Sequence, residues 1–351
     1  MFAALLACLC LQETVAGPQP QTQADRIFAA CEEYQRRSHA VGVTVAIALD
    51  GQVILNGGWG ERDREAQQPM LAGTLVRLAS VSKPVTAALA ALVAHEGKLA
   101  LDAAISTHVP DLPETLQPLT LRGLLSHTAG VRHYRNDRKD NATGHCTTRE
   151  ALALFVNDPL IAPPGTKYSY STHAFTLVTA TLEGATKQDF RTLLRERIAT
   201  PFAPTLDCED ATETKELRSA AYELVLGTAL RARVREDLSW KYAGGGMESS
   251  APDLARFADA LLHAKIVPAE VRDALWTRQK LSDGKEIDYG LGWSVPEKGR
   301  VVSHTGSQQG SSTALSVDRE SGHVVVVLSN TSGSDASDLA AQLRRILREN
   351  R

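Results

Sequence analysis

The sequence predicts an α+β fold: an antiparallel sheet built from both chain ends and flanked by helices, with a mostly helical domain inserted between them. Three observations predict it. Apolar residues follow a strand-like pattern at residues 43–56 and again at 292–329. Residues 80–285 show mostly helical spacing, and helical runs at 25–37 and 334–348 place a helix near each end. We expect a cleft where the inserted part meets the sheet, and such clefts often hold active sites.

The N-terminal part opens with a helix over residues 25–37, where apolar residues recur at helical spacing. Two strands follow, over residues 43–49 and 52–56. Asp50 and Gly51 join them, and this dipeptide favours the two-residue turn of a β-hairpin. The chain is therefore expected to begin helix, strand, strand.

The middle of the chain is expected to be helical, and strands are expected to return only near its end. Thr147, with Glu150 three residues later, has the form of a capping box. The polar residues 136–148 predict a long surface loop, a rim or lid of the cleft. Helices are predicted at 80–95, 122–125, 148–155, 171–185, 190–198, 251–264, 268–279 and 334–348, and strands at 292–295, 311–317 and 323–329.

The composition is that of a globular protein without the marks of a nucleic-acid or membrane-surface binder. The 351 residues are 43% hydrophobic, which allows a large core. The formal net charge is only -3 and the charges are scattered along the chain. Neither nucleic acid nor an anionic membrane is therefore an expected partner, and a small-molecule or peptide substrate fits better.

Residues 1–16 predict a signal peptide, with an apolar core at 2–11 and the small-residue ending Val15-Ala16. The apolar run is too short to cross a bilayer. We therefore expect an exported, periplasmic protein, with a lipid anchor at Cys8 as the alternative. Residues 17–24 are rich in Pro, Gln and Gly and predict a flexible tether.

One catalytic domain is expected after the leader and tether. Its cysteines are odd in number and form no CxxC pair, so neither a disulfide framework nor a zinc ribbon is expected from Cys31, Cys146 and Cys208. The expected domain spans residues 25–351, with an α/β part at 25–79 plus 286–351 and a helical part at 80–285.

The stretch Ser80-Val81-Ser82-Lys83-Pro84 is the first candidate for chemistry. Pro84 is tolerated only in a helix's first turn, so the helix should begin within about four residues before it, with Ser80 at or near the N-cap. Under one interpretation, Ser80 or Ser82 only caps this helix. Under the other, Ser80 and Lys83 share a helix face at i and i+3, and Lys83 is the base that activates Ser80. Lys83 can do so only if burial or nearby cations lower its pKa.

Two other stretches offer polar groups of the right kind. Residues 163–172 form a Pro-Gly turn followed by Tyr168 and Tyr170, and a tyrosine beside an ammonium can shuttle a proton. By itself the stretch is equally typical of a turn with packed tyrosines. Residues 303–307, Ser-His-Thr-Gly-Ser, precede an apolar strand and by themselves are typical of a strand-end turn.

In their order and spacing, the three stretches together resemble the motifs of the serine β-lactamase and penicillin-binding-protein superfamily. The resemblance covers nearly all of the chain after the leader. Residues 126–131, 243–247 and 289–293 resemble the class C-like branch, which includes β-lactamases, esterases, D-aminopeptidases and D-Ala-D-Ala carboxypeptidases. Within that branch, the closest likeness is to the mitochondrial serine β-lactamase-like peptidase and its bacterial relatives, through residues 132–134, 157–160, 170–172, 240–246 and 303–312.

The resemblance implies a β-lactamase/transpeptidase-like fold and a role for each matching residue. Ser80 would be the acylated nucleophile, Lys83 its general base and Tyr170 the proton shuttle to the leaving group. The backbone N–H groups of Ser80 and Ser307 would form the oxyanion hole. An extended substrate would pair with the strand edge at Thr305 and Gly306.

Two departures from the family pattern bear on the substrate. Thr172 stands where β-lactamases of this branch usually carry asparagine, so the amide that holds an acylamino group is missing. His304 stands where lysine is usual, and histidine is mostly neutral near pH 7. If His304 titrates in place of lysine, activity on carboxylate-bearing substrates should rise below about pH 6.5.

The leading interpretation is a metal-independent serine hydrolase that acts through an acyl-enzyme on an amide or ester. A peptidase or esterase is preferred to a β-lactamase or D-Ala-D-Ala carboxypeptidase. The alternative from another class is a non-catalytic penicillin sensor or self-assembling scaffold. Neither a cofactor nor a metal is expected, because the other histidines form no HExxH motif or close ligand pair.

Overall fold

The computed structural model describes residues 21–135 and 144–349. The expected signal peptide, Cys8 and most of the tether therefore lie outside the described residues, as do the first eight residues of the expected loop at 136–148. The first helix, α1, begins at Gln23, inside the segment expected to be tether. No helix in the described ranges is both long and apolar enough to cross a membrane.

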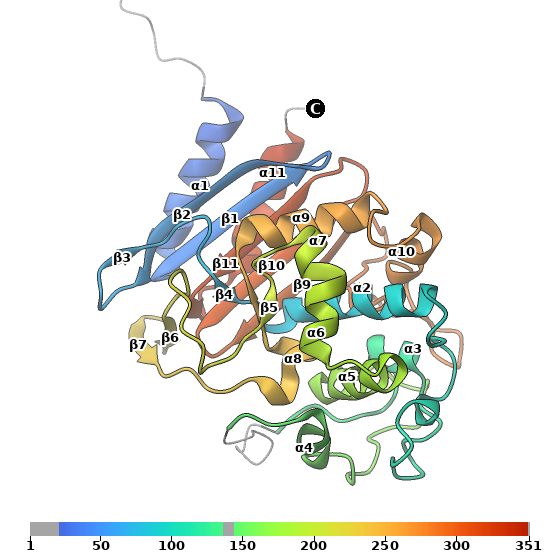
Figure 1. Ribbon diagram of the computed structural model, residues 1–351. Helices are drawn as coiled ribbons and strands as arrows, with labels where there is room; N and C mark the ends of the chain where they lie inside the picture. The colour runs from blue at the N-terminus through green and yellow to red at the C-terminus, as the bar shows by residue number, and fades with distance from the viewer. Residues whose placement is uncertain (1–20, 136–143, 350–351) are drawn as a thin grey trace, which may run out of the picture.

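A six-stranded antiparallel sheet is built from the two ends of the chain, as the sequence predicts. Its strand order, β3-β2-β1-β11-β10-β9, places the N-terminal strands beside the C-terminal ones (Figure 1). In the hairpin turn between β1 and β2, Asp50 and Gly51 both have positive φ, as the sequence suggests. The strands are β1 Gly42–Leu49, β2 Gln52–Asp63, β3 Gln68–Pro69, β9 Val301–Gln308, β10 Ser311–Asp318 and β11 Val324–Ser329.

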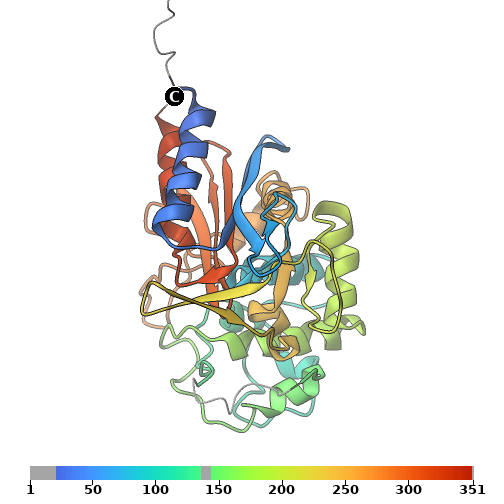
Figure 2. The same cartoon turned by 90° about the vertical axis from the view of Figure 1, so that its left-hand side faces the viewer.

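Helices cover both faces of this sheet. In the edge-on view, α1 (Gln23–Arg37) and α11 (Ala336–Arg348) lie together on one face, and the rest of the helices lie beyond the other (Figure 2). Helix α9 (Ala251–Leu262) packs on that second face. Alternate side chains of β1 enter the two cores, which explains why this strand is apolar along its whole length.

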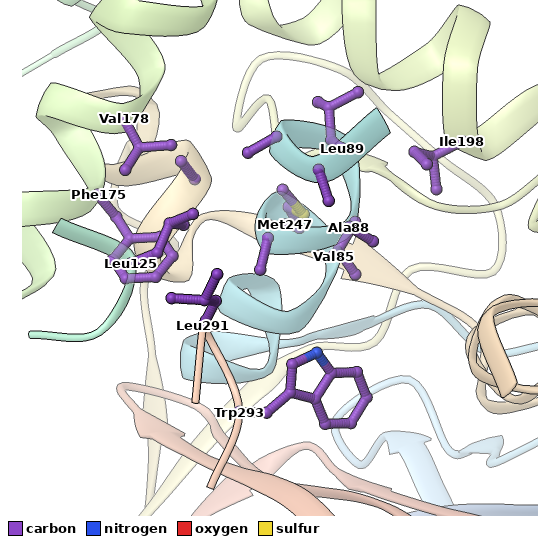
Figure 3. Packing of buried hydrophobic residues seen from close by; sticks show 14 of the residues in the cluster. Val85, Ala88, Leu89, Leu125, Phe175, Val178, Ile198, Met247, Leu291 and Trp293 are labelled. Carbon is purple, nitrogen blue, oxygen red and sulfur yellow. The ribbon is translucent and has the colours of Figure 1, made fainter. Parts of the chain in front are cut away.

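The inserted part is arranged around α2 (Ser82–His95), which is buried on nearly all sides. A helix that is apolar all round belongs in the middle of a core. Figure 3 shows Val85, Ala88 and Leu89 of this helix among side chains of its neighbours, including Phe175 and Trp293. The other helices are α3 Leu121–Leu125, α4 Thr148–Ala153, α5 Thr172–Thr186, α6 Phe190–Leu194, a π-helical turn Arg195–Ala199, α7 Thr200–Phe202, α8 Tyr242–Gly245 and α10 Ala269–Leu275.

The expectation that strands return only near residue 292 is wrong. Two three-stranded sheets include strands from residues 80–285, the part expected to be mostly helical, although none lies in a predicted helix, and residues 292–295 form no strand. The hairpin of β6 and β7 turns at Leu226 and Gly227, both with positive φ, and its few apolar side chains give a weak strand signal. The strands of these two sheets are β4 Val76–Arg77, β5 Asp207–Cys208, β8 Met247–Ser249, β6 Ala221–Val225, β7 Ala229–Arg233 and β12 Thr331–Ser332.

Candidate active site

Ser80 lies in a short 3-10 helix, Ala79–Val81, that leads into α2. Ser80 is partly exposed, whereas Ala79 and Val81 on either side of it are buried. Ala79 has a φ of 49°, a left-handed conformation that is unfavourable for alanine and is common where structure is over-determined around a functional site. The backbone therefore holds Ser80 at the surface of an otherwise buried turn.

Neither serine caps the helix, so the capping interpretation is wrong. No side chain caps either the 3-10 helix or α2. The Ser82 hydroxyl is buried and accepts a hydrogen bond from the Met247 N–H at 3.3 Å. The Ser80 hydroxyl instead accepts a hydrogen bond from Lys83, whose Nζ lies 3.2 Å from Ser80 Oγ.

Lys83 is fully buried, and its Nζ has only neutral hydrogen-bond partners. Nζ donates to the Gly244 carbonyl at 2.6 Å and lies 3.4 Å from Thr172 Oγ1. It makes no ion pair with any described residue. Burial is the main reason that the pKa of Lys83 falls well below its ordinary value, and the charge of Lys241 adds to the effect. The residue thus has the environment of a neutral amine that can accept a proton.

Tyr170 completes the group around Ser80. The Lys83 Nζ lies 4.7 Å from the centre of its ring, and the Ser80 hydroxyl is close enough to act on the pKa of the Tyr170 phenol, which it lowers. Burial raises the pKa of Tyr170, so the phenol keeps its proton at neutral pH. Ser80, Lys83, Tyr170 and Thr172 therefore meet in one place, although they come from α2, its preceding turn and the start of α5.

Two histidines to which the sequence assigned no catalytic role, His127 and His133, hold the start of α5. His127 Nδ1 accepts the Ser171 N–H at 3.1 Å, and His133 Nδ1 accepts the Thr172 N–H at 3.0 Å. Their ring centres lie 4.3 and 5.7 Å from that of Tyr170. Both histidines therefore position Tyr170, and only their short spacing in the chain could have suggested a shared role.

The segment 303–307 forms part of β9, the edge strand, and not the turn that the motif by itself suggests. Strand β9 packs against the turn that carries Ser80. A Cβ on Gly306 would lie 2.6 Å from the Leu78 carbonyl oxygen, so only glycine allows this approach. Thr313, on the neighbouring strand, donates to the same carbonyl at 2.8 Å. The resulting contact brings Thr305 and Ser307, both exposed, to the junction with Ser80.

His304 is buried and neutral, so the expected titration below pH 6.5 is wrong. Its Nε2 accepts from the Tyr289 hydroxyl at 2.8 Å, and its Nδ1 donates to the Thr305 carbonyl at 2.7 Å. Burial, with a smaller contribution from the nearby Lys83, lowers the pKa of His304 to about 3. His304 therefore supplies no cation between pH 5 and 8.

A cavity of about 460 Å³ opens beside Tyr170 and His304. Its walls are largely aromatic, and its outer part carries charged groups. The size suits a small organic group better than a long peptide. The lining consists of Tyr168, Tyr170, Ile287, Tyr289, Ser294, His304 and Thr305, with Lys285, Glu286 and Asp288.

The described part of the chain contains no group of three or more His, Cys, Asp and Glu residues that could hold a metal ion. His173, for example, stacks on Phe155 with ring centres 4.3 Å apart. The chemistry available at the site is therefore that of a hydroxyl, an amine and a phenol.

Comparison with known proteins gives a family and a fold. A family model described as Beta-lactamase matches residues 25–348. Serine beta-lactamase-like protein LACTB, mitochondrial, of Homo sapiens is 26% identical, over 87% of this chain and 76% of that protein. Esterase EstB of Burkholderia gladioli is 28% identical, over 92% of this chain and 94% of its own. The solved D-amino acid amidase from Ochrobactrum anthropi SV3 has a TM-score of 0.82, 20% identity and coverage of 93% and 99%, a likeness of fold alone.

Proposed function

Because the chain belongs to the beta-lactamase family, as its motifs predict, we propose that it is a serine hydrolase that forms an acyl-enzyme on Ser80. The observation that carries the proposal is the Lys83 amine, fully buried, 3.2 Å from Ser80 Oγ and without an ion-pair partner among the described residues. An amine with a lowered pKa is the base that a serine hydroxyl needs. The reaction requires no metal.

In the first step Ser80 Oγ attacks the carbonyl carbon of an amide or ester, and its proton passes to Lys83 Nζ. The Lys83 N–H groups bonded to Gly244 O and Thr172 Oγ1 leave the nitrogen lone pair for this proton. The N–H groups of Ser80 and Ser307 stabilise the tetrahedral oxyanion. Tyr170 relays a proton to the leaving amine or alcohol as the C–N or C–O bond breaks. Water then repeats the sequence on the acyl group and releases the acid.

We propose a peptidase or esterase in preference to a β-lactamase or D-Ala-D-Ala carboxypeptidase. The neutral His304 and the single hydroxyl of Thr172 remove two groups that would hold a β-lactam's carboxylate and acylamide. Among the relatives, EstB is named an esterase and the solved neighbour an amidase, which supports the same substrate classes. Residues 1–16 further support export to the periplasm as part of this proposal.

A substrate panel tests the proposal. The wild-type protein should release p-nitrophenol from p-nitrophenyl butyrate with an initial burst, cleave fluorogenic peptides, and act more slowly on nitrocefin and D-Ala-D-Ala. Ser80→Ala should abolish the burst. Turnover that survives Ser80→Ala would contradict the proposal, and a stable penicillin adduct without turnover of any substrate would favour the penicillin sensor.

A further inference from the structure

Lys241 is a second buried lysine at the site, and no step proposed above uses it. It lies in the turn Ser239–Lys241, just before α8, and its side chain is only 8% exposed. No hydrogen bond or ion pair joins Nζ to a described residue, and Nζ is not among the side-chain nitrogens that are completely closed to solvent. Its neighbours are aromatic: Nζ lies 4.9 Å from the Trp240 ring centre and 5.6 Å from that of Tyr134.

The charged groups near Lys241 do not neutralise it. Burial and the charge of Arg77 lower the pKa of Lys241 to about 8, so it is still mainly protonated at pH 7. Glu209 acts in the opposite direction, but its oxygens already accept from Arg77 at 2.6 and 2.7 Å. Glu236 is 44% exposed at its side chain and reaches no ion-pair distance to Lys241. The remaining charged neighbour, Lys83, is itself a cation when protonated and cannot pair with it.

Burying nine-tenths of a cation without an ion-pair partner costs several kcal/mol of desolvation free energy unless an anion binds beside it. Trp240 and Tyr134 recover part of this cost through cation–π contacts. An ammonium has three N–H donors, and the two aromatic rings cannot serve as ordinary hydrogen-bond acceptors for them. An anionic group of a bound substrate would supply the missing hydrogen-bond acceptors.

Aromatic contacts connect Lys241 to the catalytic group. They run from Lys241 to Tyr134, from Tyr134 to His133 and from His133 to Tyr170. The turn that carries Lys241 also packs against α5, which begins at Thr172, and the charge of Lys241 acts on the pKa of Lys83. In β-lactamases of the branch that the sequence resembles, the residue at the position of Thr172 contacts the acyl half of the substrate. Lys241 is therefore a buried cation close to Thr172, whereas His304 supplies no cation.

We propose that Lys241 binds a carboxylate on the acyl half of the substrate, so that the enzyme selects esters or amides of acids that carry a second carboxyl group. This inference rests on the proposed acyl-enzyme at Ser80. A carboxylate fits the site because a charge-assisted hydrogen bond to an ammonium replaces water that the aromatic walls exclude.

The test compares two p-nitrophenyl esters that differ only in charge: mono-p-nitrophenyl adipate and its methyl-capped counterpart. Wild type should favour the acid over the capped ester by roughly 10- to 100-fold in kcat/KM, the usual range for a charged hydrogen bond. Lys241→Met should reduce that ratio to about one, measured at a pH above the acid limb of each variant's profile because the charge of Lys241 also lowers the pKa of Lys83. Lys241→Arg should restore most of the ratio. Lys285→Met, which removes a cation from the cavity beside Tyr170 and His304, is the matched control and should keep the wild-type ratio.

An unchanged ratio in Lys241→Met, or the loss of the ratio in Lys285→Met instead, would overturn the proposal. An equal fall in kcat/KM with both esters, together with a shifted acid limb of the pH profile, would also overturn it. Lys241 would then act only through the pKa of Lys83. A binding measurement separates this proposal from the acyl-enzyme at Ser80. Ligand-observed NMR should detect monomethyl adipate on Ser80→Ala and not on Ser80→Ala with Lys241→Met. Equal binding to both would overturn the Lys241 site, whereas ester turnover by Ser80→Ala would overturn only the acyl-enzyme.

Discussion

Replacing Gly306 by alanine should separate catalysis from folding at the contact between β9 and the Ser80 turn. The added Cβ would lie 2.6 Å from the Leu78 carbonyl oxygen, about 0.8 Å closer than ordinary contact at 3.4 Å, and would also meet Thr313 Oγ1. Because the carbonyl belongs to the backbone, β9 must move away from Ser80 by a similar amount. An oxyanion donor works at about 2.7–3.1 Å, so this shift should cost most of the Ser307 N–H contribution, roughly 10²- to 10³-fold in kcat. Overpacking should lower the unfolding free energy by only about 1–3 kcal/mol.

Gly245→Ala is the matched control, because Gly245 faces the same turn from α8. Its Cβ would lie 3.7 Å from the Ala79 carbonyl carbon and 3.8 Å from Gln308 Oε1, both ordinary contacts. Burst kinetics with p-nitrophenyl butyrate give kcat, and urea unfolding gives the stability of each variant. The reasoning is refuted if Gly306→Ala keeps kcat within threefold of wild type, or if Gly245→Ala is equally slow.

Three further predictions concern buried polar groups. The unfolded chain takes up a proton on His304 near the ordinary pKa of 6.5 and the folded chain only near 3, so acidification destabilises the fold. Between pH 6.5 and 5, wild type should lose about 2 kcal/mol more unfolding free energy than His304→Gln in urea titrations, and equal losses would count against a neutral His304. Arg77→Met should cost about 3 kcal/mol of unfolding free energy, because the fully buried Glu209 loses its two hydrogen bonds from Arg77 and keeps Arg235 as an ion-pair partner. Arg231→Met, in an exposed pair, should cost under about 1 kcal/mol, and similar costs would contradict this difference. Thr172→Asn should raise nitrocefin acylation relative to ester hydrolysis in stopped-flow assays, and an unchanged ratio would remove the argument from Thr172.

The fold class could be predicted because its signals are local. The Asp50-Gly51 turn and the strands around it have a strong pattern, and α2 is apolar over its whole length. Strand β9 gives no such signal, because an edge strand at an active site carries polar and small side chains on its outer positions. The pattern by itself therefore favoured a turn, and only the family resemblance implied a strand edge at Thr305 and Gly306, where the structure has β9.

At the site, sequence spacing predicted that Ser80 and Lys83 would meet, and the family resemblance supplied Tyr170. Helix α2 begins at Ser82, within the four residues before Pro84 that the sequence predicts. The left-handed conformation of Ala79 in the preceding turn could not be predicted, because no local propensity favours it for alanine. The catalytic roles of these residues, and the domain boundaries, stay predictions.

Lys241 and the two histidines were overlooked for a different reason. A lysine next to tryptophan and tyrosine in the sequence is normally taken as exposed, and only the packing of Tyr134 and α8 shows that Lys241 is buried. Likewise, the bonds from backbone N–H groups to His127 and His133 join segments about forty residues apart. These contacts depend on tertiary structure that no periodicity reveals.

The central claim is that Ser80, and not Ser82, is the nucleophile. Intact-mass spectrometry after treatment with a fluorophosphonate probe tests it most directly, because the probe adds a fixed mass to an activated serine. One adduct should form on wild type and on Ser82→Ala. The wild-type Ser82 hydroxyl accepts a hydrogen bond from the Met247 N–H and is not expected to react. No adduct should form on Ser80→Ala. Labelling that persists in Ser80→Ala, or that disappears in a folded Ser82→Ala, would contradict the account.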